Sequence, residues 1–366
     1  MGSATAYHLA RRGRTVLGLE RFGIPHEMGS SHGLSRIIRL AYFEDPRYVP
    51  LLRRAYQLWR ELEGQAGEKL LYITGSVEAG LPGSVVVEGS RLACETHDLP
   101  YEMLTAAQLM RRFPAFRLPP EVGAILQGEA GFLDPERCIA AHVAIAEAHG
   151  AEIHRNEAVL GWEPRGDGVR VTTARATYEA GRLMLAAGAW TGKLMPGLVH
   201  AAVPERQALA WLRPLRPELF ALGKFPVFIL DVEDGAYYGF PMYGIAGLKI
   251  GKHHHRHEVV DPDAFDRQPA AEDERLLRAF AERYFPEGAG PTLALKSCMY
   301  TNSPDECFIV DRLPECPQVA VAAGFSGHGF KFCSVIGEIM ADLAESGATS
   351  HDIAMFRLAR FDECPQ

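Results

Sequence analysis

The sequence predicts a mixed α/β protein, in which a Rossmann-like dinucleotide-binding domain is assembled from separated segments. Three stretches support this fold class, at residues 1–20, 182–190 and 319–345, and in each an apolar strand and a helix meet at a glycine. Such turns, with the unpaired N–H groups of the following helix, suit a phosphate group. At 366 residues the chain has room for a second domain between these segments, and we expect it to contain a mixed or antiparallel sheet.

The first stretch has the pattern of the back half of a βαβ unit. A small-residue helix runs from Gly2 to a closing Gly13, and a short strand at 15–19 ends at Glu20. Gly2 corresponds to the last glycine of a G-x-G-x-x-G loop, and Glu20 to the acid that binds a ribose hydroxyl. The first strand and the first two glycines of that unit are missing. We therefore expect the complete protein to begin about 10–15 residues upstream.

The other two stretches add further contacts to a ligand. The apolar run at 182–187 ends at Gly188, where a helix begins. The run at 319–323 leads into Gly324-Phe325-Ser326-Gly327-His328-Gly329-Phe330-Lys331 and a helix at 330–345. A helix N-terminus by itself favours an acid, so the cation of Lys331 in the first turn indicates an anionic guest.

The remaining elements follow from periodicity and caps. Asp134 and Pro135 form a helix start, because Asp is a favoured N-cap and Pro a favoured first residue. Further amphipathic helices are predicted at 48–63, 105–113, 135–149 and 271–284. Strands are predicted at 152–154, 169–173, 182–187, 227–231, 237–240, 248–251 and 319–323.

Composition excludes several classes of protein. The net charge of −8 argues against a nucleic-acid or anionic-membrane partner, and no apolar run reaches the ~20 residues of a membrane span. The N-terminus lacks a signal-peptide segment, so we expect a cytoplasmic location. Seven scattered cysteines without a C-x-x-C pair indicate reduced thiols: Cys94, Cys138, Cys298, Cys307, Cys316, Cys333 and Cys364.

Two clusters of charged or titratable residues have open interpretations. Arg36 and Arg39 flank two isoleucines and need anionic partners, either a ligand or an internal carboxylate such as Glu44 or Asp45. The histidines at 253–257 invite a metal, but consecutive histidines face different ways and no carboxylate pattern accompanies them. We therefore predict no metal site.

The motifs together resemble the monomeric sarcosine oxidase family of flavoenzymes, which includes N-methyltryptophan oxidase and pipecolate oxidase. They run in family order over nearly the whole chain. The matching segments are Ser31-His32-Gly33 through Arg39, YYGFP at 237–241, LKIGKH at 248–253, SCMYT at 297–301, residues 305–311 and residues 324–331.

The resemblance implies a site. It implies FAD bound covalently through the sulfur of Cys298, and Lys249 as the cation that promotes reaction with O₂. It implies a substrate carboxylate clamped by Arg39 and Lys331 in a pocket lined by Tyr238, His253 and Tyr300. Arg36 and His328 are expected near the flavin. The further cofactor-binding residues expected are Gly2, Glu20, His32, Gly188, Gly327, Gly329, Phe330 and Lys331, with Lys249, His253, Tyr238 and Arg36 as the catalytic set.

The implied activity is oxidation of a small secondary amino acid such as sarcosine to an imine, with O₂ reduced to H₂O₂ and the imine hydrolysed to glycine and formaldehyde. Alternatives are N-methyl-L-tryptophan or L-pipecolate as substrate, a non-covalent FAD oxidase of a primary amino acid, and a flavin-free, inactive truncated form. We expect a monomer. The FAD-binding domain is predicted at 1–72, 134–200 and 299–366, and the substrate domain at 73–133 and 201–298.

Overall fold

The computed structural model describes residues 1–361. Cys364, for which a reduced thiol is predicted, and the last five residues of the predicted FAD-binding domain lie outside this range. Two parallel strand pairs build the part predicted to bind a nucleotide. β1 (Leu17–Leu19) pairs with β8 (Glu152–His154), and β12 (Leu183–Leu185) pairs with β19 (Cys316–Ala323). β18 (Ile309–Leu313) adds an antiparallel edge to β19. These pairings join segments far apart in the sequence and confirm the predicted fold class.

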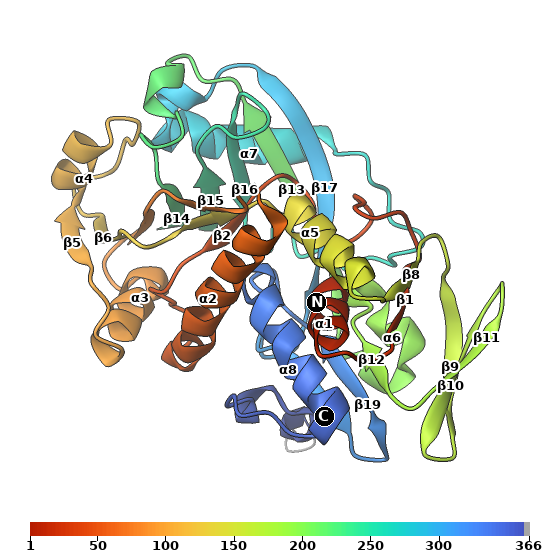
Figure 1. Ribbon diagram of the computed structural model, residues 1–366. Helices are drawn as coiled ribbons and strands as arrows, with labels where there is room; N and C mark the ends of the chain where they lie inside the picture. Colours follow the sequence, from red (N-terminus) through yellow and green to blue (C-terminus); the bar gives the residue numbers. More distant parts are fainter. Residues whose placement is uncertain (362–366) are drawn as a thin grey trace.

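Helices pack together beside these strands (Figure 1). α1 (Gly2–Arg11) lies against both α5 (Pro135–Ala148) and α8 (Cys333–Ser346), and α2 (Val49–Ala66) packs on α8. The approach of α1 to α8 depends on Gly337, where an added Cβ would lie 2.5 Å from the Cβ of Ala4. Asp134 caps α5 by accepting a hydrogen bond from the N–H of Arg137 at 3.1 Å, as predicted.

A second body of the molecule is an eight-stranded, largely antiparallel sheet, which confirms the predicted sheet type. Its order is β17 (Thr292–Asn302), β13 (Val203–Leu212), β16 (Leu248–Lys252), β15 (Gly235–Phe240), β14 (Val227–Val232), β4 (Ser76–Gly80), β6 (Gly123–Gln127) and β5 (Glu102–Thr105). α7 (Ala271–Tyr284) packs on β13 and β16, with Phe280 stacked 3.9 Å from Tyr237. An apolar core of phenylalanines fills the space beneath this helix.

Smaller elements complete the chain. Two three-stranded sheets are β2 (Arg36–Ile38), β7 (Gly131–Leu133), β3 (Leu71–Ile73) and the meander β9 (Val159–Arg165), β10 (Gly168–Thr173), β11 (Thr177–Ala180). The short helices are α3 (Val85–Thr96), α4 (Ala106–Arg112) and α6 (Thr191–Leu194). Within residues 1–361, no helix has the length and apolarity that a membrane span requires.

Several sequence-based boundaries differ from the structure. The helix predicted at 330–345 begins as a 3-10 turn, η6 (Phe330–Phe332), and α8 starts only at Cys333, so Lys331 precedes the α-helix. The strand predicted at 182–187 is limited to Leu183–Leu185. β13 and β17 were not predicted, because their burial comes from pairing with each other over ten residues and gives little polar–apolar alternation.

Candidate functional site

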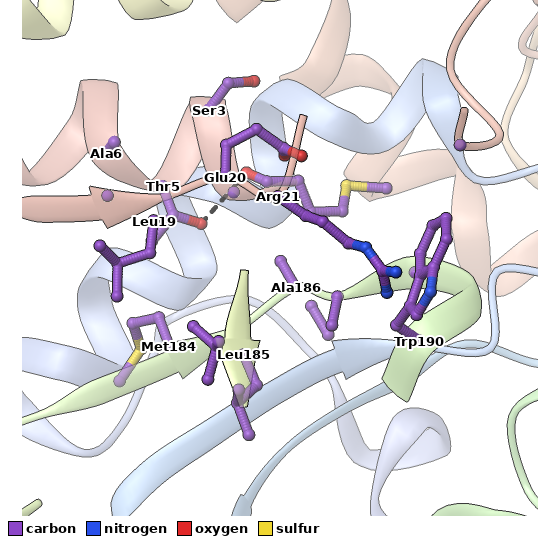
Figure 2. A pocket seen from close by; sticks show the side chains of 18 of the residues that line it. Ser3, Thr5, Ala6, Leu19, Glu20, Arg21, Met184, Leu185, Ala186 and Trp190 are labelled. Atoms are coloured by element: carbon purple, nitrogen blue, oxygen red, sulfur yellow. Dashed lines mark hydrogen bonds between the residues drawn. The ribbon is translucent and has the colours of Figure 1, made fainter. Parts of the chain in front are cut away.

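A cavity of about 1010 Å³ lies between β1 and β12 at the N-terminus of α1. Its wall includes Gly2 and Ser3 of α1, Leu19 and Glu20 at the end of β1, and Ala186 after β12. Figure 2 shows Glu20, Arg21 and Trp190 around it. The volume is at the upper end of the range for small-molecule sites, about 300–1,000 Å³, so the cavity suits a large cofactor.

The N-terminus of α1 provides a place for an anion in this cavity. The first N–H groups of a helix have no intrahelical partner, and the first turn of α1 contains no acidic residue. A Cβ added to Gly2 would meet only the Cβ of Ala186, at 3.6 Å, so the backbone here is open to a ligand. These features fit a pyrophosphate, as predicted for Gly2.

Glu20 is oriented at the edge of the cavity. Its Oε1 accepts a hydrogen bond from the N–H of Phe22 at 2.8 Å and lies 3.5 Å from Nε2 of His26. Beside it, the Arg21 guanidinium lies 5.3 Å from the Trp190 ring. The sequence analysis overlooked Arg21 and Trp190, although the first directly follows Glu20 and the second closes the Gly188 turn.

The glycine-rich turn at 324–331 contacts the chain itself. Gly327 has a φ of +80°, and a Cβ there would lie 2.3 Å from the Tyr300 ring. A Cβ at Gly329 would lie 2.4 Å from the Cβ of Phe325. Both glycines also line the cavity, but their close contacts are with aromatic side chains of the protein. The glycines of this turn therefore serve packing within the protein as well as the approach to a ligand predicted from the sequence.

Lys249 lies buried next to the loop after His32. Its Nζ donates hydrogen bonds to the carbonyl oxygens of Gly33 (2.7 Å) and Ser35 (2.8 Å) and to Oγ of Ser35 (3.0 Å). Burial, followed by the nearby Arg36 charge, lowers the pKa of Lys249 well below its ordinary value. Glu136 fixes the same loop, because its Oε1 accepts from the N–H of Gly33 at 2.6 Å. Sequence analysis overlooked Glu136.

Cys298, His32 and Arg36 share this region. Burial raises the pKa of the Cys298 thiol, while the Arg36 and Lys249 charges oppose that shift. Both ring nitrogens of His32 are buried without a hydrogen-bond partner, and burial lowers its pKa to about 3. Arg36 lines the cavity and donates to the carbonyl oxygen of Ser30 at 2.7 Å. A buried, unsatisfied imidazole beside a cavity fits contact with a bound group.

Tyr238, Tyr300 and His253 form a second group, on the large sheet. The Tyr300 hydroxyl lies 3.5 Å from that of Tyr238, and the His253 ring centroid lies 5.5 Å from that of Tyr300. Burial raises the pKa of Tyr238 to about 12 and lowers that of His253 to about 3. All three side chains are therefore neutral near pH 7.

Arg39 and Lys331 form a third group, around Tyr42. The Arg39 Cζ and the Lys331 Nζ lie 4.6 and 5.0 Å from the centroid of the Tyr42 ring. Arg39 also binds the Glu44 carboxylate at 2.7 Å, so the internal partner considered for this arginine is Glu44. Asp45, the other one, pairs instead with Arg47.

Titration in this group reflects burial and charge. Burial lowers the pKa of Lys331 to about 7, and the neighbouring Arg39 charge adds to the shift. Burial by itself would raise the pKa of Glu44, but Arg39 and the neighbouring basic side chains together outweigh this effect, and the pKa falls to about 2. His328 contacts the Tyr42 hydroxyl through Nδ1, and burial lowers its pKa to about 4. Sequence analysis overlooked Tyr42.

The predicted residues thus fall into a cavity set and a buried set. The cavity is lined by Gly2, Glu20, Arg36, Gly188, Tyr300, Gly327, Gly329 and Phe330. The residues outside its lining are His32, Arg39, Tyr238, Lys249, His253, Cys298, His328 and Lys331. The two sets meet at Arg36 and at Tyr300, which belongs to the same strand as Cys298.

Comparison with known proteins extends this picture. A family model described as FAD dependent oxidoreductase matches residues 1–343. A monomeric sarcosine oxidase of Streptomyces avermitilis is 42% identical over 376 residues, covering 100% of this chain and 96% of the relative. An N-methyl-L-tryptophan oxidase of Yersinia pestis is 36% identical, covering 99% and 96%.

Solved structures have the same fold. NikD, an unusual amino acid oxidase essential for nikkomycin biosynthesis, superimposes with a TM-score of 0.85 at 28% identity, covering 97% of this chain and 94% of that one. An L-proline dehydrogenase from P. horikoshii gives a TM-score of 0.83 at 21% identity, covering 98% and 94%, which supports the fold alone.

Fold and cavity define a dinucleotide-binding α/β protein, and the matches specify the dinucleotide. The chain belongs to the FAD-dependent oxidoreductase family. Its cofactor is FAD, and the cavity at α1, the Glu20 carboxylate and the unsatisfied His32 imidazole fit that group.

Proposed function

We propose that the protein oxidises a small secondary amino acid such as sarcosine, with O₂ as electron acceptor. The observation that carries this proposal is the pairing of Arg39 with Glu44 beside Lys331. Two buried basic side chains lie around the Glu44 carboxylate, and burial raises the pKa of the second nearby acid, Glu78, to about 7, so the group has the chemistry to bind the carboxylate of an amino acid. The names of relatives that are 36–42% identical point to N-methyl amino acids.

Substrate binding would exchange one carboxylate for another. The Glu44 side chain is 20% exposed, whereas that of Arg39 is 2% exposed, so Glu44 is the partner with room to move. The guanidinium can then bind the substrate carboxylate in a bidentate manner, and Lys331 adds a point charge. Tyr238, Tyr300 and His253, all neutral, would line the space for the amine and its small substituent.

When bound, FAD accepts a hydride equivalent from the carbon attached to the amine nitrogen and returns the electrons to O₂. Water then hydrolyses the imine product, which for sarcosine gives glycine and formaldehyde. In its protonated form, Lys249 would stabilise the negative charge that develops on oxygen, because it is buried in a water-excluded setting. Cys298, in a strand next to Lys249 and Arg36, would hold the cofactor covalently through its sulfur.

The same proposal covers the organisation of the molecule. The FAD-binding part comprises residues 1–72, 134–200 and those from 299 onward, and the substrate part 73–133 and 201–298. We also propose a cytoplasmic monomer with no nucleic-acid or membrane partner. N-Methyl-L-tryptophan is the second candidate substrate, because it is named for a relative at 36% identity.

A substrate panel tests the proposal. Peroxide formation is measured with sarcosine, N-methyl-L-tryptophan, pipecolate, glycine and N-methylethylamine, which lacks the carboxylate. We expect the highest kcat/KM for sarcosine and little turnover of the amine without a carboxylate. Preference for glycine over sarcosine would contradict a secondary-amine oxidase.

A further inference from the structure

The turn after β16 carries four histidines that point in different directions. His255 points inward, with Nε2 2.9 Å from Oδ1 of the buried Asp273. His254 and His257 form a parallel pair, with ring centroids 5.6 Å apart and an angle of 8° between the rings. His255 anchors the turn from inside, and this fixes His254 and His257 on its other side.

A carboxylate from a distant strand meets this histidine pair. Oε1 of Glu205, in β13, lies 3.2 Å from Nδ1 of His254, and its Oε2 lies 3.6 Å from Nδ1 of His257. One ligand atom from each of the three residues lies within 4.8 Å of the others. Ligand atoms around a tetrahedral zinc ion, with bonds of about 2.0–2.2 Å, are about 3.3–3.5 Å apart.

We infer that Glu205, His254 and His257 bind a divalent transition-metal ion of the zinc class. Two imidazoles and one carboxylate are a borderline donor set, which favours Zn²⁺ over the oxygen-seeking Mg²⁺ and Ca²⁺. The prediction of no metal site rested on the different directions that consecutive histidines face and on the lack of a carboxylate or cysteine pattern with ligand spacing around them. The fold supplies that carboxylate from a residue about fifty positions away.

The surroundings of the three residues orient them as metal ligands. Gln207 donates from Nε2 to Oε1 of Glu205 at 2.6 Å, and Asn302 donates from Nδ2 to Oε2 at 3.1 Å. On the far side of the His254 ring, Oε1 of Glu306 lies 3.2 Å from Nε2. A carboxylate at the second ring nitrogen is the arrangement that fixes the tautomer of a ligating histidine.

A cluster of ion pairs without a metal is the simpler interpretation, and two contacts argue against it. In such a cluster His254 would bridge Glu205 and Glu306 with a proton on each ring nitrogen. Nδ1 of His254 also lies 3.4 Å from the Asn302 amide nitrogen, a donor that suits a lone pair on Nδ1. His257, although 77% exposed, turns its Nδ1 toward Oε2 of Glu205 at 3.6 Å, the orientation that a third ligand would have.

An ion here would join two turns near the proposed substrate pocket. The His254 ring lies 4.2 Å from that of His253, and the Glu306 carbonyl oxygen contacts Nε2 of His328 at 3.0 Å. The ion would link the 253–257 turn directly to β13, and its His254 ligand would link it to Glu306. Binding should therefore raise the Tm of the holoenzyme.

Calorimetric titration with ZnCl₂ of the flavin-loaded enzyme, first dialysed against EDTA, tests the site. The variant is His257→Ala, because this exposed side chain can be removed without disturbing the core. The matched control is His200→Ala, another exposed histidine. We expect wild type and His200→Ala to bind one more equivalent of Zn²⁺ than His257→Ala, and only those two to gain Tm on Zn²⁺ addition.

The expected outcome with MgCl₂ is no heat and no Tm change in any of the three proteins. Equal stoichiometry and affinity for Zn²⁺ in wild type and His257→Ala would overturn the inference. Loss of the same Zn²⁺ equivalent in His200→Ala as in His257→Ala would overturn it too. Neither readout uses amine oxidation, so failure here leaves the proposed activity unaffected.

Discussion

The guanidinium of Arg39 lies on the carboxylate of Glu44, with Nη2 2.7 Å from Oε2. The Arg39 residue is 1% exposed, and its Nη1 donates to the carbonyl oxygen of Ala41 at 2.7 Å, so its position is fixed by the backbone as well. The pair thus provides a preorganised cation, and in the proposed function its partner Glu44 would give way to the substrate carboxylate. This exchange connects the fold to the proposed choice of an amino acid as substrate.

Removing either cation should weaken substrate binding. Arg39→Met or Lys331→Met is expected to raise KM for sarcosine. The rise should correspond to a loss of about 1.5–3 kcal/mol in binding free energy, because a charge-assisted hydrogen bond is lost. Steady-state kinetics with peroxide detection gives the value. Arg47→Met, which removes an exposed arginine paired with Asp45, serves as the control. If kcat/KM for N-methylethylamine fell as much as kcat/KM for sarcosine in these variants, binding of the substrate carboxylate by Arg39 and Lys331 would be refuted.

Lys249 should act on oxygen rather than on the amine. Lys249→Met is expected to slow reoxidation by O₂ far more than reduction by substrate, because the cation acts where negative charge develops on oxygen. Stopped-flow measurement of each half-reaction separates the two. Lys252→Met, three residues along the same sheet region, is the control. An oxidative rate unchanged in Lys249→Met removes this residue from the mechanism.

Cys298 should carry the cofactor. After denaturation, yellow colour should stay with the wild-type chain, and mass spectrometry should find the flavin mass on the peptide that contains Cys298. Cys298→Ser should release its FAD on denaturation, whereas Cys94→Ser, another buried cysteine, should not. An unmodified Cys298 peptide from active enzyme would show that the link is absent.

Glu78 should make stability depend on pH. Burial raises its pKa from the ordinary 4.5 to about 7, although Arg39, 4.0 Å away, opposes this. Because the neutral acid is the form that the fold favours, its contribution is fully present below pH 4.5 and lost as pH rises through 7. The Gln side chain of Glu78→Gln stays neutral at every pH. The free energy of unfolding of this variant should therefore rise relative to wild type by up to about 3 kcal/mol between pH 4.5 and 8.

Urea unfolding of both proteins at several pH values measures this difference. Glu282→Gln, which alters an exposed glutamate, should follow the wild-type pH profile. A Glu78→Gln profile parallel to wild type would mean that folding does not raise the pKa of Glu78.

Local sequence patterns predicted the longer helices and the strands of the two parallel pairs β1–β8 and β12–β19, but missed α3 and β4. Asp134 before Pro135 located the start of α5, and the apolar run before Gly324 located β19, because caps and buried strands depend on neighbouring residues. The same reasoning could not find β13, which is buried through its pairing with β17. Long-range pairing has no local signal.

In the site, too, the sequence predicted individual residues but not their long-range contacts. The motifs named Arg39 and Lys331 in advance, but not that both lie against Tyr42. The Lys331–Tyr42 contact joins residues about 290 positions apart, which only the assembled fold reveals. The Arg39 partner was narrowed to Glu44 or Asp45, and the choice depended on the conformation of that loop.

The central claim is that a small N-methyl amino acid is oxidised at its methyl carbon. Sarcosine labelled with ¹³C in the N-methyl group, incubated with the flavin-loaded enzyme in air, tests this directly. We expect labelled formaldehyde, glycine and H₂O₂ in a 1:1:1 ratio, measured by NMR and a peroxide assay. Glyoxylate with labelled methylamine would instead mean oxidation at the other carbon, and absence of all products would contradict the proposed substrate.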